Sequence, residues 1–304
     1  MSAPTILSTK TLSVPYLSTT VSYATPSSQS SFASNKPTLV FINSFSTTSS
    51  LYAPQFANKE LCAAANLIAI EPLGHGGTKT PYEHWTYWDS AHVNLQVLEG
   101  LGVEKAFVLG TSQGGWVAVR MALLGGSKVQ GVIALGTSMD YESPRSVEKG
   151  CWDAVTLVTP TIHAFTSATP TPDFVAPDQY AEFLCSSGFG DDCARDVVDF
   201  WRERVQEVYR GDEGRKKIRS AAIALRDRDG LRGRVGDVKC RVLWMHGTQD
   251  MVYSYANAEE EIELFTAAED ARLVKVEGGK HFLSASNPVE VTSEVIKFLR
   301  GSSP

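Results

Sequence analysis

The sequence has little positive charge and no long apolar run, and each absence excludes a class of protein. Among its 304 residues, 34 acidic side chains outnumber 28 Lys and Arg, which gives a formal net charge of −6. A nucleic-acid-binding protein would be expected to carry a basic face, so we exclude that class of partner. No apolar stretch reaches the ~18 unbroken residues of a membrane-spanning helix, so no membrane segment is expected.

Cysteine is also scarce, and its spacing is irregular. The chain has 5 cysteines, an odd number that does not fit the paired framework of a disulfide-rich secreted domain. No C-x-x-C or H-x-x-x-H pair indicates a metal site. Neither end of the sequence resembles a secretion signal or an ER or peroxisomal address. We therefore expect a reduced, cytoplasmic protein with no metal.

Short apolar runs separated by helical stretches dominate most of the chain. The runs are Thr38–Ile42, Leu67–Ile70, Ala106–Leu109, Val129–Leu135, Arg241–Met245 and Arg272–Val276. The helical stretches are Asp89–Leu101, Trp116–Leu124, Ala256–Thr266 and Pro288–Arg300, the last with Asn287 as N-cap. Continuous apolar strands with helices between them indicate an α/β fold with a mostly parallel sheet covered on both faces. Upstream, the weak alternation in Thr5–Ser8 and Thr20–Tyr23 predicts two edge strands.

Residues 141–236 break this alternation. The segment has five prolines, many aromatic residues and helical charge patterning over Asp196–Tyr209, and no strand-like run stands out. We predict a helical domain at residues 141–236, inserted into a core domain made of residues 1–140 and 237–304.

The most informative motif is Gly110-Thr111-Ser112-Gln113-Gly114. It directly follows a predicted strand and directly precedes a predicted helix, which is the context that a G-x-S-x-G nucleophile elbow needs. The turn places its serine in a strained conformation, and neighbours with side chains would collide there. We predict that Ser112 is a nucleophile exposed at the N-terminus of a helix, where backbone N–H groups favour an anion.

A serine nucleophile needs a base, and the base needs an acid. His281 follows the run Arg272–Val276 through a glycine turn, and we expect the other five histidines to be structural. Asp250 lies just past the run Arg241–Met245, and the order Ser112, Asp250, His281 is that of a Ser-Asp-His hydrolase triad. Asp140 is the alternative acid, because it also follows a predicted strand at the same sheet edge.

These motifs together identify a resemblance. From about Pro37 to Arg300, the chain resembles the α/β-hydrolase superfamily, in the form with a helical cap inserted between strands 6 and 7, and fungal hydrolases of secondary metabolism in particular. Pro72–Gly76 resembles the family's loop after the fourth strand. Gly278–Phe282, followed by Asn287-Pro288, resembles its histidine loop and last helix.

The resemblance also implies an oxyanion hole, with two departures from the family pattern. The family's His-Gly after the third strand is replaced by Asn43-Ser44, and the backbone N–H of the next residue, Phe45, takes the role of one donor. The N–H of Gln113, directly after the nucleophile, is the other. Glu71 stands where the family often has Asp, and we expect it to brace the loop around His75.

Aromatic residues in the insertion suggest an apolar pocket. They are Trp152, Phe165, Phe174, Phe183, Phe189 and Trp201. Most are expected to form the core of the insertion itself, while a few face Ser112. Our predicted substrate-pocket residues are Ser44, Trp116, Trp152 and Phe282.

These features predict a cofactor-free serine hydrolase that is a monomer or homodimer. Its partner would be a small-molecule substrate, an ester, lactone or thioester of a medium-sized apolar metabolite, cleaved through an acyl-enzyme on Ser112. Two alternatives stay open. The same triad serves C–C bond hydrolases and cofactor-free perhydrolases, and the same fold serves ligand-binding receptors.

Overall fold

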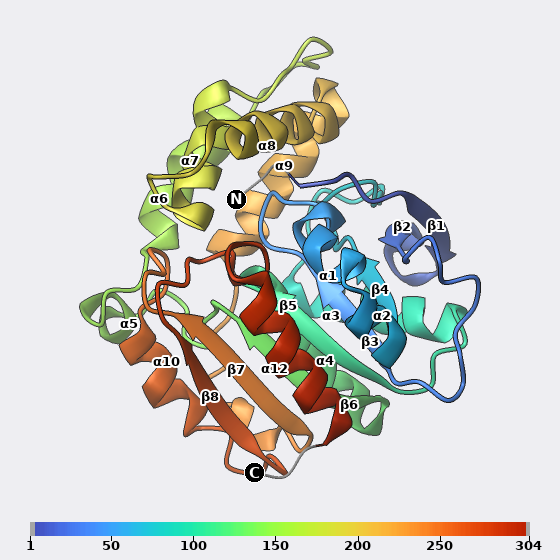
Figure 1. Ribbon diagram of the computed structural model, residues 1–304. Coiled ribbons are helices and arrows are strands. Elements are labelled where there is room, and N and C mark those ends of the chain that lie inside the picture. The colour runs from blue at the N-terminus through green and yellow to red at the C-terminus, as the bar shows by residue number, and fades with distance from the viewer. Residues whose placement is uncertain (1–3, 302–304) are drawn as a thin grey trace.

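An eight-stranded sheet forms the centre of the computed structural model, which describes residues 4–301 (Figure 1). The strands are β1 (Thr9–Val14), β2 (Thr19–Ala24), β3 (Thr38–Ile42), β4 (Asn66–Ile70), β5 (Ala106–Thr111), β6 (Val129–Leu135), β7 (Arg241–Gly247) and β8 (Ala271–Val276). Their order across the sheet is β1-β2-β4-β3-β5-β6-β7-β8. All pairs from β4 to β8 are parallel, and β2 pairs antiparallel with both β1 and β4. The expected α/β fold with a mostly parallel sheet is confirmed.

Helices cover both faces of this sheet. They are α1 (Ala53–Ala57), α2 (Lys59–Ala64), α3 (Tyr87–Gly100), α4 (Gln113–Gly125), α5 (Pro144–Glu148), α6 (Ala154–Ala164), α7 (Asp178–Phe189), α8 (Arg195–Val208), α9 (Gly211–Arg226), α10 (Tyr255–Ile262), α11 (Leu283–Ser286) and α12 (Pro288–Arg300). Short 3-10 turns lie at Tyr16–Ser18, Ser49–Tyr52, Gly126–Lys128 and Val235–Asp237. Within residues 4–301, none of the helices combines the length and apolarity needed to cross a membrane.

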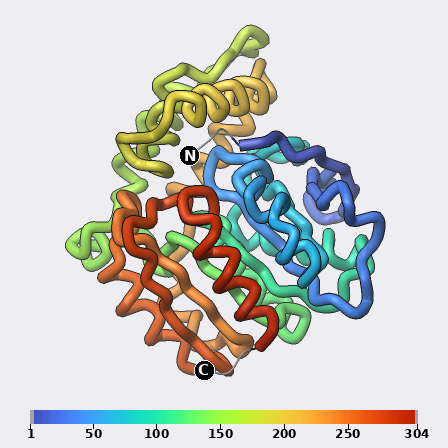
Figure 2. Tube along the Cα trace, in the orientation of Figure 1, coloured from blue at the N-terminus to red at the C-terminus, as the bar shows by residue number. Residues whose placement is uncertain are grey.

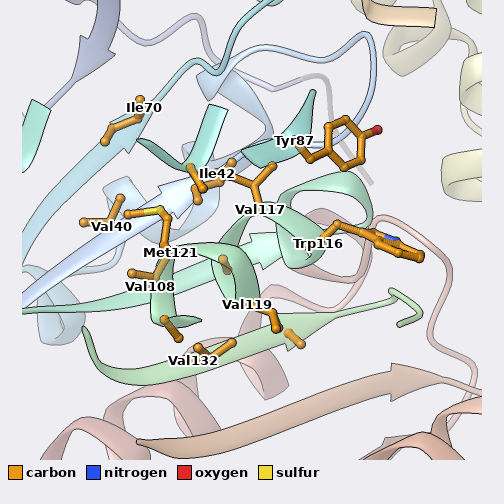
Figure 3. Packing of buried hydrophobic residues seen from close by; sticks show 14 of the residues in the cluster. Val40, Ile42, Ile70, Tyr87, Val108, Trp116, Val117, Val119, Met121 and Val132 are labelled. Carbon is orange, nitrogen blue, oxygen red and sulfur yellow. The ribbon is translucent and has the colours of Figure 1, made fainter. Parts of the chain in front are cut away.

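The alternation of side chains along each central strand divides the core in two. In β3, Val40 and Ile42 belong to the cluster that packs with α3 and α4, shown in Figure 3. Leu39 and Phe41 belong to the cluster on the opposite face, which includes Val291 of α12. Because successive side chains of a strand point to opposite faces, a strand buried on both faces must be apolar throughout.

One local prediction is wrong. The first strand begins at Thr9, not within Thr5–Ser8, because its pairing with β2 starts at Thr9 and Ala24. Asn287 is the N-cap of α12, as predicted, although its side chain makes no capping hydrogen bond. Instead, its Oδ1 accepts a hydrogen bond from Ser286 Oγ at 2.9 Å.

The helices α5 to α9 follow β6 and precede β7, and most of them gather beyond one end of the sheet (Figures 1 and 2). No strand of the sheet lies between β6 and β7 in the described part of the chain. α6 packs against α9, and α7 against α8. That residues 141–236 form a separate domain stays a prediction.

A buried ion pair joins the two segments that connect helices α5 to α9 to the sheet. Glu142 follows β6, Arg228 follows α9, and their side chains are 3% and 0% exposed. The Arg228 guanidinium lies 4.6 Å from the ring centroid of Trp116 in α4 and donates a hydrogen bond to the carbonyl oxygen of Leu225. Removing one partner of a buried pair leaves an uncompensated charge, which is far more costly than removing both.

We expect Arg228→Met to lower the free energy of unfolding by about 3–5 kcal/mol, because Glu142 would keep a buried charge with no counter-charge. The double variant Arg228→Met/Glu142→Met should recover most of that loss. Urea denaturation of the wild type and the two variants measures both effects. If the single and double variants were equally unstable, the ion pair would not be the source of the loss.

Candidate active site

Ser112 lies in a sharp turn between β5 and α4. Its φ of 54° and ψ of −119° are unusual for a residue with a side chain. The flanking glycines make the turn possible. A Cβ on Gly110 would lie 2.0 Å from the backbone of Gly114, and a Cβ on Gly114 would lie 2.0 Å from the carbonyl oxygen of Ile42. Both positions therefore require glycine, as the elbow motif implies.

His281 and Asp250 form a close pair beside this turn. The Nδ1 atom of His281 lies 3.0 Å from each carboxylate oxygen of Asp250. Asp250 Oδ1 also accepts the backbone N–H groups of Val252 and Tyr253, at 2.8 and 3.0 Å. With its Nδ1 proton donated to Asp250, His281 keeps Nε2 unprotonated and able to act as a base.

Burial and nearby charge oppose each other at Asp250. Burial by itself raises the pKa of the Asp250 carboxyl, but the charge and hydrogen bond of His281, the charge of His246 and the Tyr253 N–H together lower it more. The net pKa of Asp250 is below its usual range, so this side chain is a carboxylate at neutral pH. A buried carboxylate can stabilise an imidazolium that forms next to it.

The alternative acid, Asp140, has other partners. Its Oδ2 accepts a hydrogen bond from Ser143 Oγ at 2.7 Å and one from Arg145 Nη1 at 3.0 Å. The structure thus brings Asp250, and not Asp140, into contact with His281.

His75, expected to be only structural, is hydrogen bonded to Gln113, the residue after the nucleophile. Its Nδ1 donates to the carbonyl oxygen of Leu73 at 2.9 Å, which leaves Nε2 to accept from Gln113 Nε2 at 2.9 Å. The other end of the Gln113 side chain accepts from the hydroxyl of Tyr87 at 3.1 Å. The ring of His75 also lies edge-on to that of Phe45, with centroids 6.1 Å apart. His75 therefore touches both residues that we expect to supply the oxyanion donors.

The loop that carries Phe45 is held from two sides. Within the loop, the Asn43 side chain donates to the carbonyl oxygen of Thr47 at 2.8 Å. Glu71 joins this loop to the loop around His75, which we expect it to brace. One of its carboxylate oxygens accepts from the N–H and hydroxyl of Ser49, both at 3.0 Å, and the other accepts from the N–H of Gly77 at 2.7 Å.

One cavity contains both Ser112 and His281. Its other lining residues are Ser44, Phe45, Trp152, Ala154, Leu157, Val158, Thr161, Tyr180, Phe183, Leu184, Ser187, Leu225, Val252, Tyr253 and Phe282. Of the predicted pocket residues, Ser44, Trp152 and Phe282 are therefore in place. None of the described lining residues is an Asp, Glu, Lys or Arg.

Trp116, which we predicted to line the substrate pocket, does not line this cavity. It is fully buried within the cluster on the α3 and α4 face of the sheet (Figure 3), under the guanidinium of Arg228. Trp116 lies one turn after Ser112 along α4, packed against Arg120 and Arg228. The aromatic residues of the insertion divide as expected: Phe165, Phe189 and Trp201 are buried in the core, and Trp152 and Phe183 line the cavity.

Comparisons with known proteins identify the family and the fold. The family model described as "alpha/beta hydrolase fold" matches residues 37–288. The chain is similar to a hydrolase from Pseudomonas aeruginosa PA01, with 20% identity, a TM-score of 0.76 and coverage of 97% of this chain and 98% of that one. It is also similar to the enol-lactonase from Burkholderia xenovorans LB400, with 21% identity, a TM-score of 0.73 and coverage of 96% and 100%. At such identities the likeness shows the fold alone. A search of curated proteins finds no match.

The burial of His75 makes stability depend on pH. Burial lowers the pKa of His75 to about 4, whereas an unfolded histidine titrates near ~6.5. Between these values the unfolded chain binds the extra proton, so the free energy of unfolding falls as pH falls from about 6.5 to about 4. From pH 7 to pH 4.5, the wild type should lose about 2 kcal/mol more than His75→Gln, measured by urea denaturation at each pH. Equal losses in the two proteins would contradict a neutral, buried His75.

Proposed function

The chain belongs to the alpha/beta hydrolase family, and from that premise we propose that it is a serine hydrolase. The proposed substrate is a carboxylic ester, lactone or thioester of a medium-sized apolar metabolite. The observation that carries this proposal is the shared cavity, because Ser112 and His281 both line it. Asp250 is hydrogen bonded to Nδ1 of His281, which leaves Nε2 as the nitrogen that can act on Ser112.

In the first step, Ser112 Oγ attacks the carbonyl carbon of the substrate and its proton passes to Nε2 of His281. Asp250 holds the ring in the tautomer that makes Nε2 the acceptor, and it stabilises the imidazolium that results. The carbonyl oxygen becomes an oxyanion. The N–H groups of Phe45 and Gln113 would bind it, and Gln113 is the first residue of α4, where backbone N–H groups have no partner within the helix.

In the second step, the tetrahedral intermediate collapses. The bond between the acyl carbon and the alcohol oxygen breaks, or the bond to sulfur in a thioester, and the imidazolium of His281 donates its proton to the leaving group. The acyl group stays on Ser112 as an ester. A water molecule, deprotonated by His281, then attacks the acyl carbon. The bond from this carbon to Ser112 Oγ breaks, His281 returns the proton to Oγ, and the carboxylic acid leaves. With a lactone, the alcohol and the acid leave as one molecule.

The cavity supports an uncharged, apolar substrate. Most of its lining side chains are aliphatic or aromatic, and none of those described bears a fixed charge. A carboxylate or ammonium group placed there would lose its hydration without gaining a counter-charge, which is costly. Helices α6 and α7 supply much of the lining, and we propose that residues 141–236 act as a cap that excludes water during the reaction.

We expect Ser112→Ala to abolish labelling by a fluorophosphonate probe and to lower kcat for a p-nitrophenyl ester on the order of 10⁴-fold or more, since the nucleophile is lost. Thermal melting should stay close to that of the wild type. Turnover of vinylogous diketones in preference to esters would point to C–C bond hydrolysis on the same residues. A wild type that neither labels nor turns over would favour a binding protein.

The acid is tested by a matched pair of variants. Asp250→Asn should lower kcat by about 10⁴-fold, because the amide cannot stabilise the imidazolium and favours the wrong tautomer of His281. Asp140→Asn should keep kcat within about threefold, because Asp140 bonds to Ser143 and Arg145. Both variants must melt like the wild type for the comparison to hold. The reverse pattern of activities would assign the acid to Asp140.

A further inference from the structure

The cavity around Ser112 has a buried end and an open end. At the buried end, Ser112 and His281 are 7% and 4% exposed. At the other end, Leu157 and Phe183 line the same cavity although they are 40% and 46% exposed. Leu157 belongs to α6 and Phe183 to α7, so these two helices supply the exposed part of the lining.

An aromatic pair stands at this open end. The rings of Trp152 and Phe183 are stacked, with centroids 5.4 Å apart and planes inclined by 15°. They are fixed to different parts of the molecule. The backbone N–H of Trp152 donates to the carbonyl oxygen of Val252 at 2.8 Å, in the loop that carries Asp250, whereas Phe183 is part of α7. The pair therefore bridges the sheet side and the helical side of the opening.

Between the two ends, the lining residues follow the repeat of a helix face. Those on α6 are Ala154, Leu157, Val158 and Thr161, and those on α7 are Tyr180, Phe183, Leu184 and Ser187. Both sets have the spacing i, i+3, i+4 and i+7, which marks one face of a helix. An apolar stripe of this kind normally packs against a core. Here the two stripes line the cavity, and we call the part of the cavity that they line the channel.

We propose that an uncharged, linear hydrocarbon tail of the substrate occupies this channel and leaves it alongside the stacked rings of Trp152 and Phe183. The proposal rests on the proposed function, which places the reacting carbonyl at Ser112, the buried end. The ring pair then sets how long and how wide a tail the enzyme accepts. Either the acyl or the alcohol side of an ester can carry such a tail.

The test is a chain-length series. We measure kcat/KM for p-nitrophenyl esters with acyl chains from acetate to decanoate, and for alkyl acetates of the same lengths, with the wild type, Trp152→Ala and Phe183→Ala. Val155→Ala is the matched control, because Val155 is a 46%-exposed apolar residue of α6 that does not line the cavity. Melting temperatures check that each variant is folded.

In the wild type, kcat/KM should rise by up to about fourfold for each methylene that becomes buried, in at least one of the two series. In both ring variants, the ratio of octanoyl to acetyl kcat/KM, or its alkyl acetate equivalent, should fall by about tenfold or more. Val155→Ala should keep the wild-type ratio. A wild type without chain-length dependence in either series, or ring variants with the wild-type ratio, would overturn the proposal.

A second measurement does not need turnover. Dissociation constants of n-alkanols from butanol to decanol, determined by calorimetry, should decrease with chain length in the wild type and depend less on it in the ring variants. If alkanol binding depends on chain length in this way but the fluorophosphonate probe does not label Ser112, the channel is supported and the proposed hydrolase function is rejected. Labelling of Ser112 with alkanol binding that is independent of chain length would support the hydrolase and reject the channel.

Discussion

Close contact of backbone with backbone at Gly110 and Gly114 is the constraint on which the rest of the site depends. β5, α4 and the end of β3 meet so closely there that no Cβ fits at either glycine. This contact holds Ser112 in its strained conformation and starts α4 directly beneath it. It also brings the end of β3, and so the loop with Phe45, next to the nucleophile. The candidate nucleophile and the backbone N–H groups proposed as oxyanion donors thus depend on one packing contact.

The helical segment is connected to each loop that carries a candidate catalytic group. Tyr180 of α7 hydrogen bonds through its hydroxyl to Ser46 Oγ at 2.5 Å, in the loop of Phe45. The backbone N–H of Phe282, the residue after His281, donates to the carbonyl oxygen of Gly188 at 2.8 Å. Gly188 is glycine for a steric reason, since a Cβ there would lie 2.2 Å from the Phe282 ring. The positions of His281 and of the loop with Phe45 therefore depend on how α7 packs against them.

Residue patterns within short windows were enough to predict the sheet and the groups around Ser112. β6 and α12 have the predicted limits, because an apolar run and a proline at the first helical position are local signals. The position of Asp250 beside His281 followed from strand ends that meet at one sheet edge. The family comparison confirms the fold. The site roles themselves stay predictions.

Contacts between distant segments were not predictable in this way. The hydrogen bond from Gln113 to His75 joins residues 38 positions apart, and nothing in either segment indicates it. Trp116 was misplaced because aromatic character alone does not say whether a helical residue faces the sheet or the cavity. The N-terminal strand was placed too early because alternating Ser, Thr and apolar residues extend beyond the part that pairs with β2.

The order of the groups along the chain has a consequence for synthesis on the ribosome. The strands β3, β5 and β6, which surround the elbow, precede the helical segment, whereas Asp250 and His281 follow β7 and β8. These two strands are added at one edge of the sheet, beside β6, so the elbow can fold before either is made. A nascent chain that has Ser112 still lacks His281 and Asp250. With the proposed roles of these residues, the chain would become catalytically competent only when its last part is made, after the segment with α6 and α7.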